Sequence, residues 1–214
     1  MKLRRLGIIG DVHTEAAHLE RALRFFKTAA VDQIICTGDI TDGPGQADAC
    51  CRLLQQHAVV TVRGNHDRWL FEGVMRDLPG ATQIGELRDT SLSFLKSLPS
   101  TNPLDTVAGR LLLCHGMGAN DMQGVTPDDD GYALQFKDEL HSLVRGGEFH
   151  FVVAGHTHQR MVRRFEHLTV INAGTLNRPY DPCISIADFE AGHVEFHNFE
   201  GADLAPMGQR LDFA

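Results

Sequence analysis

The chain has 214 residues, of which 43% are hydrophobic and 22% charged, and this composition predicts one globular domain over residues 1–214 rather than a disordered chain. Its net charge of −8, with no run of Lys or Arg after residue 5, disfavours long nucleic acids, which are bound chiefly through basic side chains. No segment reaches the roughly 18 apolar residues of a membrane helix. Five cysteines without a Cys-x-x-Cys spacing favour a reducing compartment. We therefore expect a cytoplasmic protein with no membrane partner; the oligomeric state stays open.

The N-terminal half alternates apolar runs with helical patterns, which is typical of an α/β fold. Residues 3–10 predict a buried strand, and a helix is expected from about Glu15, with Thr14 as its N-cap. A second apolar run is followed by a helix that places Cys50 and Cys51 in its apolar stripe. We interpret both as core residues, because a free cysteine behaves as a small apolar side chain.

The middle of the chain is less regular. Residues 68–103 show a mixed pattern that indicates short helices, and residues 107–114 predict a strand. A helix is expected over residues 132–144, with Ala133 and Phe136 on its buried face.

After residue 158 the period changes from helical to alternating, which predicts antiparallel strands joined by short turns. The predicted strands cover residues 161–165, 168–172, 183–189 and 193–199. His193, Glu195 and His197 share one face of the last strand, a face that we expect to be exposed to solvent. The tail from about Gly201 lacks periodicity, and we expect it to be loosely ordered. The whole pattern predicts two packed sheets flanked by helices.

Five apolar runs of the sequence each end in side chains that bind metals. If the corresponding strands lie side by side, the loops at their ends converge at one edge of the fold. The residues concerned are Asp11, His13, Asp39, Asn65, His115, His156 and His158. All seven offer nitrogen or oxygen and none a thiolate, a donor set that suits Mn, Fe, Co, Ni or Zn.

Seven ligands exceed the three or four protein ligands of a single catalytic zinc. One shared carboxylate would give four protein bonds to each of two ions, and Asp39 is the best candidate for that bridge. Two ions about 3.5–4 Å apart can hold a hydroxide and the non-bridging oxygens of a phosphoryl group. His66, next to Asn65 but not needed as a ligand, would protonate the departing alkoxide as a general acid.

Five motifs carry these residues, and they follow one another in the order Asp11-x-His13, Gly38-Asp39, Gly64-Asn65-His66-Asp67, His115-Gly116 and Gly155-His156-Thr157-His158. In this order and spacing they resemble the calcineurin-like metallophosphoesterase superfamily. The resemblance implies a four-layer α/β/β/α sandwich and a dinuclear centre, with Mn as the first candidate metal. It also implies that one ion is held by Asp11, His13, Asp39 and His158. The second would be held by Asp39, Asn65, His115 and His156, with His66 near the leaving group.

Two differences from the phosphoprotein phosphatases indicate which branch of the superfamily the chain resembles most. Phosphoprotein phosphatases of this superfamily have Arg where this chain has Gly43, and Glu where it has Asp67. The chain is therefore more similar to the small bacterial and archaeal phosphodiesterases. Asp42 stands where family phosphatases orient the catalytic histidine, so that it is the candidate support of His66. We interpret Asp67 as a structural residue that bonds its own loop.

The resemblance leads us to expect a phosphodiesterase that attacks a small phosphodiester or nucleotide with a metal-bound hydroxide. The alternatives are a phosphomonoesterase, a dinucleoside polyphosphate hydrolase and, in another class, a protein-binding scaffold like that of the retromer coat. No substrate-binding residue is singled out by the sequence. The loop over residues 117–131 is either part of the substrate rim or a plain surface loop. Arg178 and Tyr180 either contact substrate or simply belong to a turn rich in proline.

Overall fold

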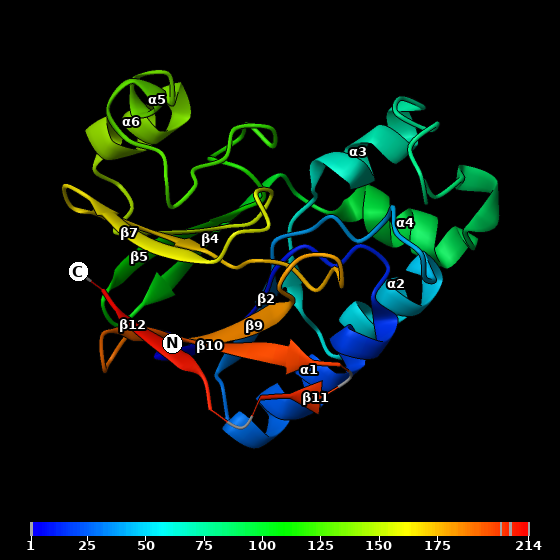
Figure 1. The fold of residues 1–214 in the computed structure, drawn as a ribbon, viewed down its shortest axis with the longest axis horizontal. Coiled ribbons are helices and arrows are strands. Elements are labelled where there is room, and N and C mark those ends of the chain that lie inside the picture. The colour runs from blue at the N-terminus through cyan, green and yellow to red at the C-terminus, as the bar shows by residue number, and fades with distance from the viewer. Residues whose placement is uncertain (1, 202, 206, 214) are drawn as a thin grey trace.

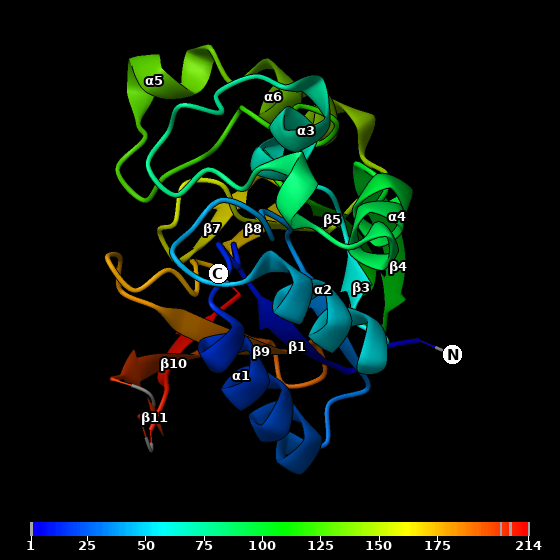
Figure 2. The same ribbon diagram turned by 90° about the vertical axis from the view of Figure 1, so that its right-hand side faces the viewer.

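The computed structural model describes residues 2–201, 203–205 and 207–213. Their first sheet has the strand order β11-β10-β9-β1-β2-β3, with β12 also paired to β10. Figure 1 labels β2, β9, β10, β11 and β12 of this sheet, and Figure 2 labels β1 and β3. Its strands are β1 (Arg5–Ile9), β2 (Gln33–Cys36), β3 (Val60–Thr61), β9 (Cys183–Asp188), β10 (His193–Glu200), β11 (Asp203–Leu204) and β12 (Gln209–Asp212). The three strands β1, β2 and β3 are parallel to one another, whereas β9 runs antiparallel to β1.

The second sheet has the strand order β4-β5-β6-β8-β7. Its strands are β4 (Thr101–Thr106), β5 (Gly109–Cys114), β6 (Phe151–Ala154), β7 (Met161–Phe165) and β8 (Leu168–Asn172). The central strands β5, β6 and β8 are parallel, and the edge strands β4 and β7 are antiparallel to their neighbours. Both sheets are therefore mixed.

Helices cover the outer faces of both sheets. The helices among the described residues are α1 (Ala16–Ala29), α2 (Ala47–Gln56), α3 (Asn65–Glu72), the 3-10 helix η1 (Ile84–Glu86), α4 (Asp89–Ser97), α5 (Gly131–Gln135) and α6 (Asp138–Gly146). Figure 2 shows α1 and α2 beside each other over the first sheet, and Figure 1 shows α5 and α6 beyond the second. The predicted four-layer α/β/β/α sandwich is confirmed. Within the described residues, no helix is both long and apolar enough to cross a bilayer.

Three hydrophobic clusters fill the spaces between the four layers. Because successive side chains of a strand point to opposite faces, Ile8 of β1 packs between the two sheets while Ile9 packs against the helices of the first layer. In β5, likewise, Leu113 points between the sheets and Leu112 packs toward α6. All of these side chains are at most 6% exposed, and burying each stabilises the fold by about 1.5–3 kcal/mol. The strands read as continuous apolar runs because both of their faces are covered.

Two boundary predictions for the first half of the fold are wrong. Helix α1 begins at Ala16 without a side-chain cap, and the Thr14 hydroxyl instead accepts a hydrogen bond from the Gly45 N–H at 2.7 Å. The expected strand over residues 107–114 begins only at Gly109, and a separate strand, β4, precedes it. Pro103 argues against a strand here when only the sequence is considered. An edge strand such as β4 tolerates proline because one side of it has no partner.

The expected helix over residues 132–144 is interrupted at Phe136 and Lys137. Phe136 is 62% exposed and Ala133 is exposed as well, so the buried face predicted for this end of the helix is wrong. The Lys137 ammonium group donates a hydrogen bond to the Gly124 carbonyl at 2.6 Å. The chain therefore turns at Lys137 to hold the preceding loop, a contact that helical periodicity does not reveal.

Three further findings concern the last strands. The four predicted strands are present as two antiparallel pairs, β7 with β8 in the second sheet and β9 with β10 in the first. His197 is only 6% exposed, contrary to the solvent-facing position that we expected, because its ring lies 4.7 Å from that of Phe25 in α1. In the tail, β12 pairs with β10, a pairing that the absence of periodicity does not indicate. Residues 202, 206 and 214 of the tail lie outside the described residues.

Candidate metal centre

The fold brings all seven predicted ligands to one edge of the two sheets. They lie at or just beyond the carboxyl ends of five strands, with Asp11 and His13 after β1, Asp39 after β2, Asn65 after β3, His115 after β5, and His156 and His158 after β6. Parallel neighbours such as β1 and β2, or β5 and β6, end at the same side of their sheet, so that polar side chains placed there meet.

The interior of this cluster is fully buried. Asp11, Asp39 and His115 are at most 1% exposed, and each offers a ligand atom within 4.8 Å of the others. His115 Nε2 lies 3.3 Å from Asp39 Oδ2 and 2.8 Å from Asn65 Oδ1. The same Asn65 oxygen lies 3.0 Å from His156 Nδ1. Two imidazoles, one amide oxygen and one carboxylate thus converge on one point.

A second group of donors adjoins the first. His13 Nε2 and His158 Nε2 face each other at 3.0 Å, and His158 Nε2 lies 3.2 Å from Asp11 Oδ2. Asp39 Oδ2 is 3.8 Å from His13 Nε2, so that this carboxylate borders both groups. The arrangement gives two neighbouring sets of nitrogen and oxygen donors with Asp39 between them.

Hydrogen bonds to backbone carbonyls orient two histidine rings so that their Nε2 atoms face this cluster. His13 Nδ1 donates a hydrogen bond to the Asp42 carbonyl at 2.7 Å, and His115 Nδ1 donates one to the Thr37 carbonyl at 2.9 Å. With Nδ1 held in this way, Nε2 is the nitrogen of each ring that is placed to bind a metal. Metal-binding histidines are usually oriented in this way, by a hydrogen bond from the ring nitrogen that does not bind the metal.

The electrostatics of the cluster favour a bound cation. Burial alone would raise the pKa of Asp39, but His115 and the other nearby imidazoles outweigh it and hold this pKa below its usual range. Burial would lower the pKa of His115, but Asp39 and Asp11 outweigh that effect and raise it to about 10. Two buried carboxylates thus require positive charge beside them, and the donor set and its geometry fit divalent metal ions.

Unusual backbone conformations hold the ligand loops. Asp39, His13, His156 and His158 all have φ between 42° and 65°, a region that residues other than glycine rarely adopt. Each such residue costs on the order of 1 kcal/mol or more. The loops keep these conformations because strands and hydrogen bonds fix them on both sides.

Two glycines leave room for the carboxylates. A Cβ atom on Gly155 would overlap Asp11 Oδ1, and one on Gly64 would overlap Asp39 Oδ1. Both glycines belong to the predicted motifs, and the structure gives the steric reason for them. Gly43 is required in the same way, because a side chain there would collide with the His13 carbonyl oxygen.

Asp67 ties two ligand loops together without facing the cluster. Its Oδ1 accepts hydrogen bonds from the Ile40 and Thr41 N–H groups at 2.9 and 3.1 Å, and its Oδ2 accepts one from the Gly64 N–H at 3.1 Å. Its interpretation as a structural residue is confirmed. The bonds reach the Asp39 loop as well as its own.

The two predicted catalytic residues are in contact at the open side of the cluster. His66 Nδ1 lies 2.8 Å from Asp42 Oδ2, and His66 Nε2 lies 4.0 Å from Asp39 Oδ2. Burial lowers the pKa of His66, but the hydrogen bond to Asp42 and the charge of Asp39 outweigh it, so the net shift is upward. The Asp42 carboxylate is also bound by Arg76, a residue that no sequence motif indicates.

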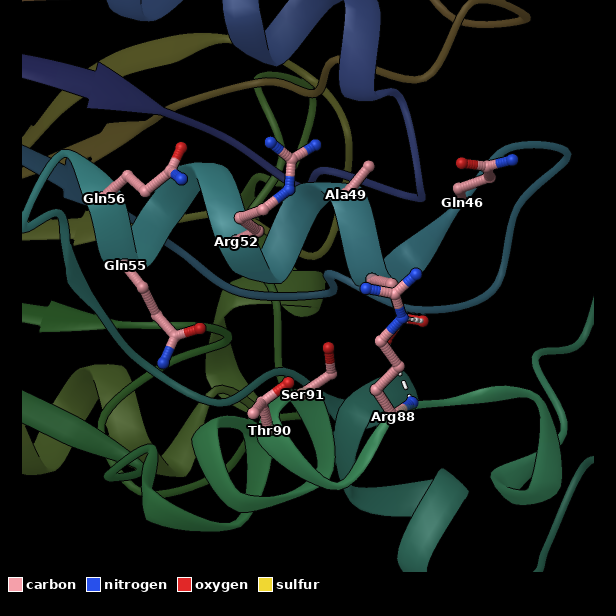
Figure 3. A pocket seen from close by; sticks show the side chains of 9 residues that line it. Gln46, Ala49, Arg52, Gln55, Gln56, Arg88, Thr90 and Ser91 are labelled. Carbon is pink, nitrogen blue, oxygen red and sulfur yellow. Dashed lines mark hydrogen bonds and ion pairs between the residues drawn. The ribbon is translucent and has the colours of Figure 1, made fainter.

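A pocket of about 490 Å³ opens beside His66. Its walls are formed by His13, Asp42, Gly43, Pro44, His66, Leu78, Pro79, Gly80, His158, Asn177, Pro179 and Tyr180. The sequence analysis did not identify residues 78–80 as part of the pocket wall, because a short Pro-Gly turn does not indicate which distant residues it packs against. A second hollow of about 520 Å³ lies between α2 and α4 and is lined mainly by polar side chains, including Arg52, Gln55 and Arg88 (Figure 3). None of the predicted metal ligands lines it, so we identify the hollow beside His66 as the candidate substrate pocket.

The structure bears on three contacts that the sequence left open. Tyr180 lines the pocket, and its ring lies 4.7 Å from that of His158. Arg178 instead binds Glu15, with its Nε 2.9 Å from each carboxylate oxygen. The loop over residues 117–131 lies against the cluster, because a Cβ on Gly124 would be 3.3 Å from His156 Cδ2.

Comparisons with known proteins agree with this geometry. The model of the calcineurin-like phosphoesterase superfamily domain matches residues 5–192. The protein MJ0912 of Methanocaldococcus jannaschii is 25% identical over 178 residues, which are 80% of this chain and 69% of that protein. A metallophosphoesterase from Sphaerobacter thermophilus has a TM-score of 0.69 at 20% identity, with 93% of this chain and 89% of that chain covered. An archaeal phosphodiesterase has a TM-score of 0.60 at 16% identity, with 91% and 99% covered. Since the family model spans most of the sequence, and the fold and the convergent aspartates and histidines agree with it, the chain belongs to the calcineurin-like phosphoesterase superfamily.

Proposed function

We propose that the protein is a phosphodiesterase that hydrolyses a small phosphodiester or nucleotide at a dinuclear metal centre. The observation that carries the preference for a diester is the pocket beside His66. Among the described residues that line it there is no Lys or Arg, and Pro44, Leu78, Pro79 and Tyr180 make much of its wall apolar. Such a wall suits the uncharged ester group of a substrate with a single negative charge.

The position of Asp39 supports the proposal of two ions. Its Oδ2 lies 3.3 Å from His115 Nε2 in one donor group and 3.8 Å from His13 Nε2 in the other. We therefore assign Asp39 as the bridging ligand. One ion would be held by Asp11, His13, Asp39 and His158, and the other by Asp39, Asn65, His115 and His156. Manganese is the first candidate, and Fe, Zn, Ni and Co suit the same donors.

The proposed reaction is in-line attack of water on phosphorus. Divalent ions bound here would lower the pKa of the attacking water and offset the charge on the phosphoryl oxygens. The attacking water gives up one proton to the solvent, and as the bond from the resulting hydroxide oxygen to phosphorus forms, the bond from phosphorus to the ester oxygen breaks. His66 gives its Nε2 proton to that departing oxygen, and Asp42 holds the ring through Nδ1, at 2.8 Å.

Substrate charge separates the diesterase from its alternatives. A phosphomonoester carries up to two negative charges and a dinucleoside polyphosphate more, and Arg or Lys side chains often bind such extra phosphate charge. Among the described residues, Arg76 is the only one whose guanidinium group contacts Asp42. That group already donates two hydrogen bonds to the Asp42 carboxylate, which neutralise its charge. The net charge of −8 further favours a small substrate over long nucleic acid.

The test compares bis(p-nitrophenyl) phosphate with p-nitrophenyl phosphate and a dinucleoside polyphosphate, each with protein loaded with Mn²⁺. We expect the highest kcat/KM on the diester. A clear preference for the monoester or the polyphosphate would overturn the diesterase proposal. Lack of turnover on a broad panel of phosphate esters would instead favour the scaffold role.

A further inference from the structure

We propose that Arg76 is a positioning residue that holds Asp42, and through it His66, in the orientation needed for proton transfer to the leaving group. The inference deepens the proposed function and rests on the role given there to His66. Arg76 belongs to the segment over residues 73–82, which we name the strap. The strap follows α3 and returns along the loop that carries Asp42.

The Arg76 guanidinium binds the Asp42 carboxylate with two hydrogen bonds. Its Nη1 donates to Asp42 Oδ1 at 2.9 Å, and its Nη2 donates to Asp42 Oδ2 at 2.7 Å. The side chain of Arg76 is only 15% exposed and that of Asp42 only 5%. Such two-pronged pairing fixes the plane of a carboxylate as well as its place, and it is stronger away from water.

The fixed carboxylate determines where the His66 ring points. Asp42 Oδ2 accepts from Arg76 and also lies 2.8 Å from His66 Nδ1. With Nδ1 held in this way, Nε2 is the ring nitrogen directed at the metal cluster, 4.0 Å from Asp39 Oδ2. The order of contacts is therefore Arg76, Asp42, His66 and then the reacting groups, and Arg76 itself touches none of the metal ligands among its described hydrogen bonds.

The remaining hydrogen bonds of Arg76 anchor the strap. Its Nη1 and Nε donate to the Thr82 and Val74 carbonyls, each at 2.8 Å. The Thr82 N–H donates to Asp42 Oδ1 at 2.9 Å, and the Gly43 N–H donates to the Gly80 carbonyl at 2.9 Å. Several hydrogen bonds therefore connect the strap to the Asp42 loop, and the ion pair between Arg76 and Asp42 lies among them.

These contacts predict a specific kinetic defect when Arg76 is removed. The Asp42 carboxylate would keep the hydrogen bond from the Thr82 N–H but lose both from the guanidinium group, so that it could rotate and the His66 ring would lose its alignment. Leaving groups that need a proton should suffer most. The p-nitrophenolate ion leaves without one, whereas phenolate is a stronger base and gains more from protonation.

The experiment compares bis(p-nitrophenyl) phosphate with diphenyl phosphate, on the full chain loaded with Mn²⁺. We expect Arg76→Ala to lower kcat on diphenyl phosphate by on the order of 10–100-fold, and to lower it much less on bis(p-nitrophenyl) phosphate. Arg76→Lys keeps the charge but not the two-pronged geometry, so an intermediate loss on diphenyl phosphate is expected. It also decides the question if the alanine variant does not fold.

Arg68→Ala is the matched control. Arg68 also forms a two-pronged pair, with Asp121, through Nε and Nη2 at 2.7 and 2.9 Å. Its remaining side-chain bond goes to Glu72 and not to Asp42 or His66. For Arg68→Ala, the ratio of kcat on diphenyl phosphate to kcat on bis(p-nitrophenyl) phosphate should equal that of the wild type. The double variant Arg76→Ala/His66→Ala should be no slower than His66→Ala alone, because the two residues act as one unit.

Equal losses on both diesters, or multiplied effects in the double variant, would overturn the inference. If the wild type hydrolyses neither diester, the proposed function has failed, and a ¹⁵N-edited NMR spectrum of the histidine rings still decides the role of Arg76. The wild type should show a protected His66 Nδ1 proton in the hydrogen bond to Asp42, and Arg76→Ala should lose that protection. An unchanged His66 signal would contradict the inference.

Discussion

The interior and the rim of the candidate metal centre are built in different ways. In the interior, Asp11, Asp39 and His115 are at most 1% exposed, and each lies one to three residues beyond the end of a strand. At the rim, the His66 side chain is 22% exposed and Tyr180 is 51% exposed. The interior therefore depends on the order of the strands, whereas the rim depends on how loops pack. Damage to the first should remove metal, and damage to the second should remove turnover or selectivity.

The largest effect is expected from Asp39→Asn in the interior. Asparagine tolerates the positive φ of 45° at this position, so the loop should keep its shape while the shared negative charge is lost. Transition-state stabilisation by the metals is worth several kcal/mol, so kcat/KM should fall by about 10³-fold or more.

Thermal unfolding provides a readout of the same variant that does not depend on activity. Metal ions that bind only the folded state raise its stability, by about 2.7 kcal/mol at 100 times Kd. EDTA should therefore lower the Tm of the Mn²⁺-loaded wild type and have much less effect on Asp39→Asn. An equal response of both proteins to EDTA would count against Asp39 as a metal ligand.

His66→Ala tests the rim. The ring donates no required metal bond in the proposed assignment, so the variant should bind the same amount of metal as the wild type. Its kcat on diphenyl phosphate, whose leaving group gains from protonation, should fall by about 10²–10⁴-fold, the usual contribution of general acid catalysis. Loss of metal together with turnover, measured by elemental analysis and steady-state kinetics, would place His66 in the interior instead.

A smaller effect on metal affinity is expected from Gly155→Ala. The new methyl group would overlap Asp11 Oδ1 and displace a ligand without removing it. Metal affinity should drop by about 10–100-fold in a competition titration with a chelator, as for other changes that misorient a ligand. Gly146→Ala is the control, because a Cβ there meets nothing within 4 Å. Equal affinities of the two variants would show that the tight fit around Asp11 is unimportant.

The smallest effect concerns His197, which lies outside the metal centre. Burial lowers the pKa of His197, and Glu195, whose Oε1 is 3.5 Å from Nε2, only partly opposes this. As the pH falls below the ordinary value of 6.5, the unfolded chain takes up a proton that the folded protein does not, and stability falls. His197→Phe should remove this loss, with a gain in Tm relative to wild type on the order of 2 °C between pH 7.5 and pH 5. A wild-type minus variant difference that does not change with pH would refute this account.

The sequence predicted the interior of the site much better than its rim, for a physical reason. Asp39 and His115 each follow an apolar run of the sequence. Because parallel strands end at the same side of a sheet, such local patterns predict that residues far apart in the sequence lie close together in the fold. Arg76 and Leu78 lie in a strap without periodicity, and only loop packing brings them to Asp42 and the pocket. The burial predicted for Phe136 is wrong for a related reason, because the helix stops where Lys137 turns to bind a loop carbonyl.

The sequence also did not show which strand faces are covered by helices. An alternating strand indicates which residues share a face but not what lies over it, and α1 covers the side of β10 that carries His197. The four layers could be predicted because their apolar runs are long and continuous.

Counting the metal ions in the purified protein tests the account most directly. Elemental analysis of protein saturated with Mn²⁺ and freed of excess ions should give two ions per chain for the wild type and for His66→Ala, and fewer for Asp39→Asn. A saturated wild type that holds one ion or none would contradict the dinuclear centre and the bridging role of Asp39.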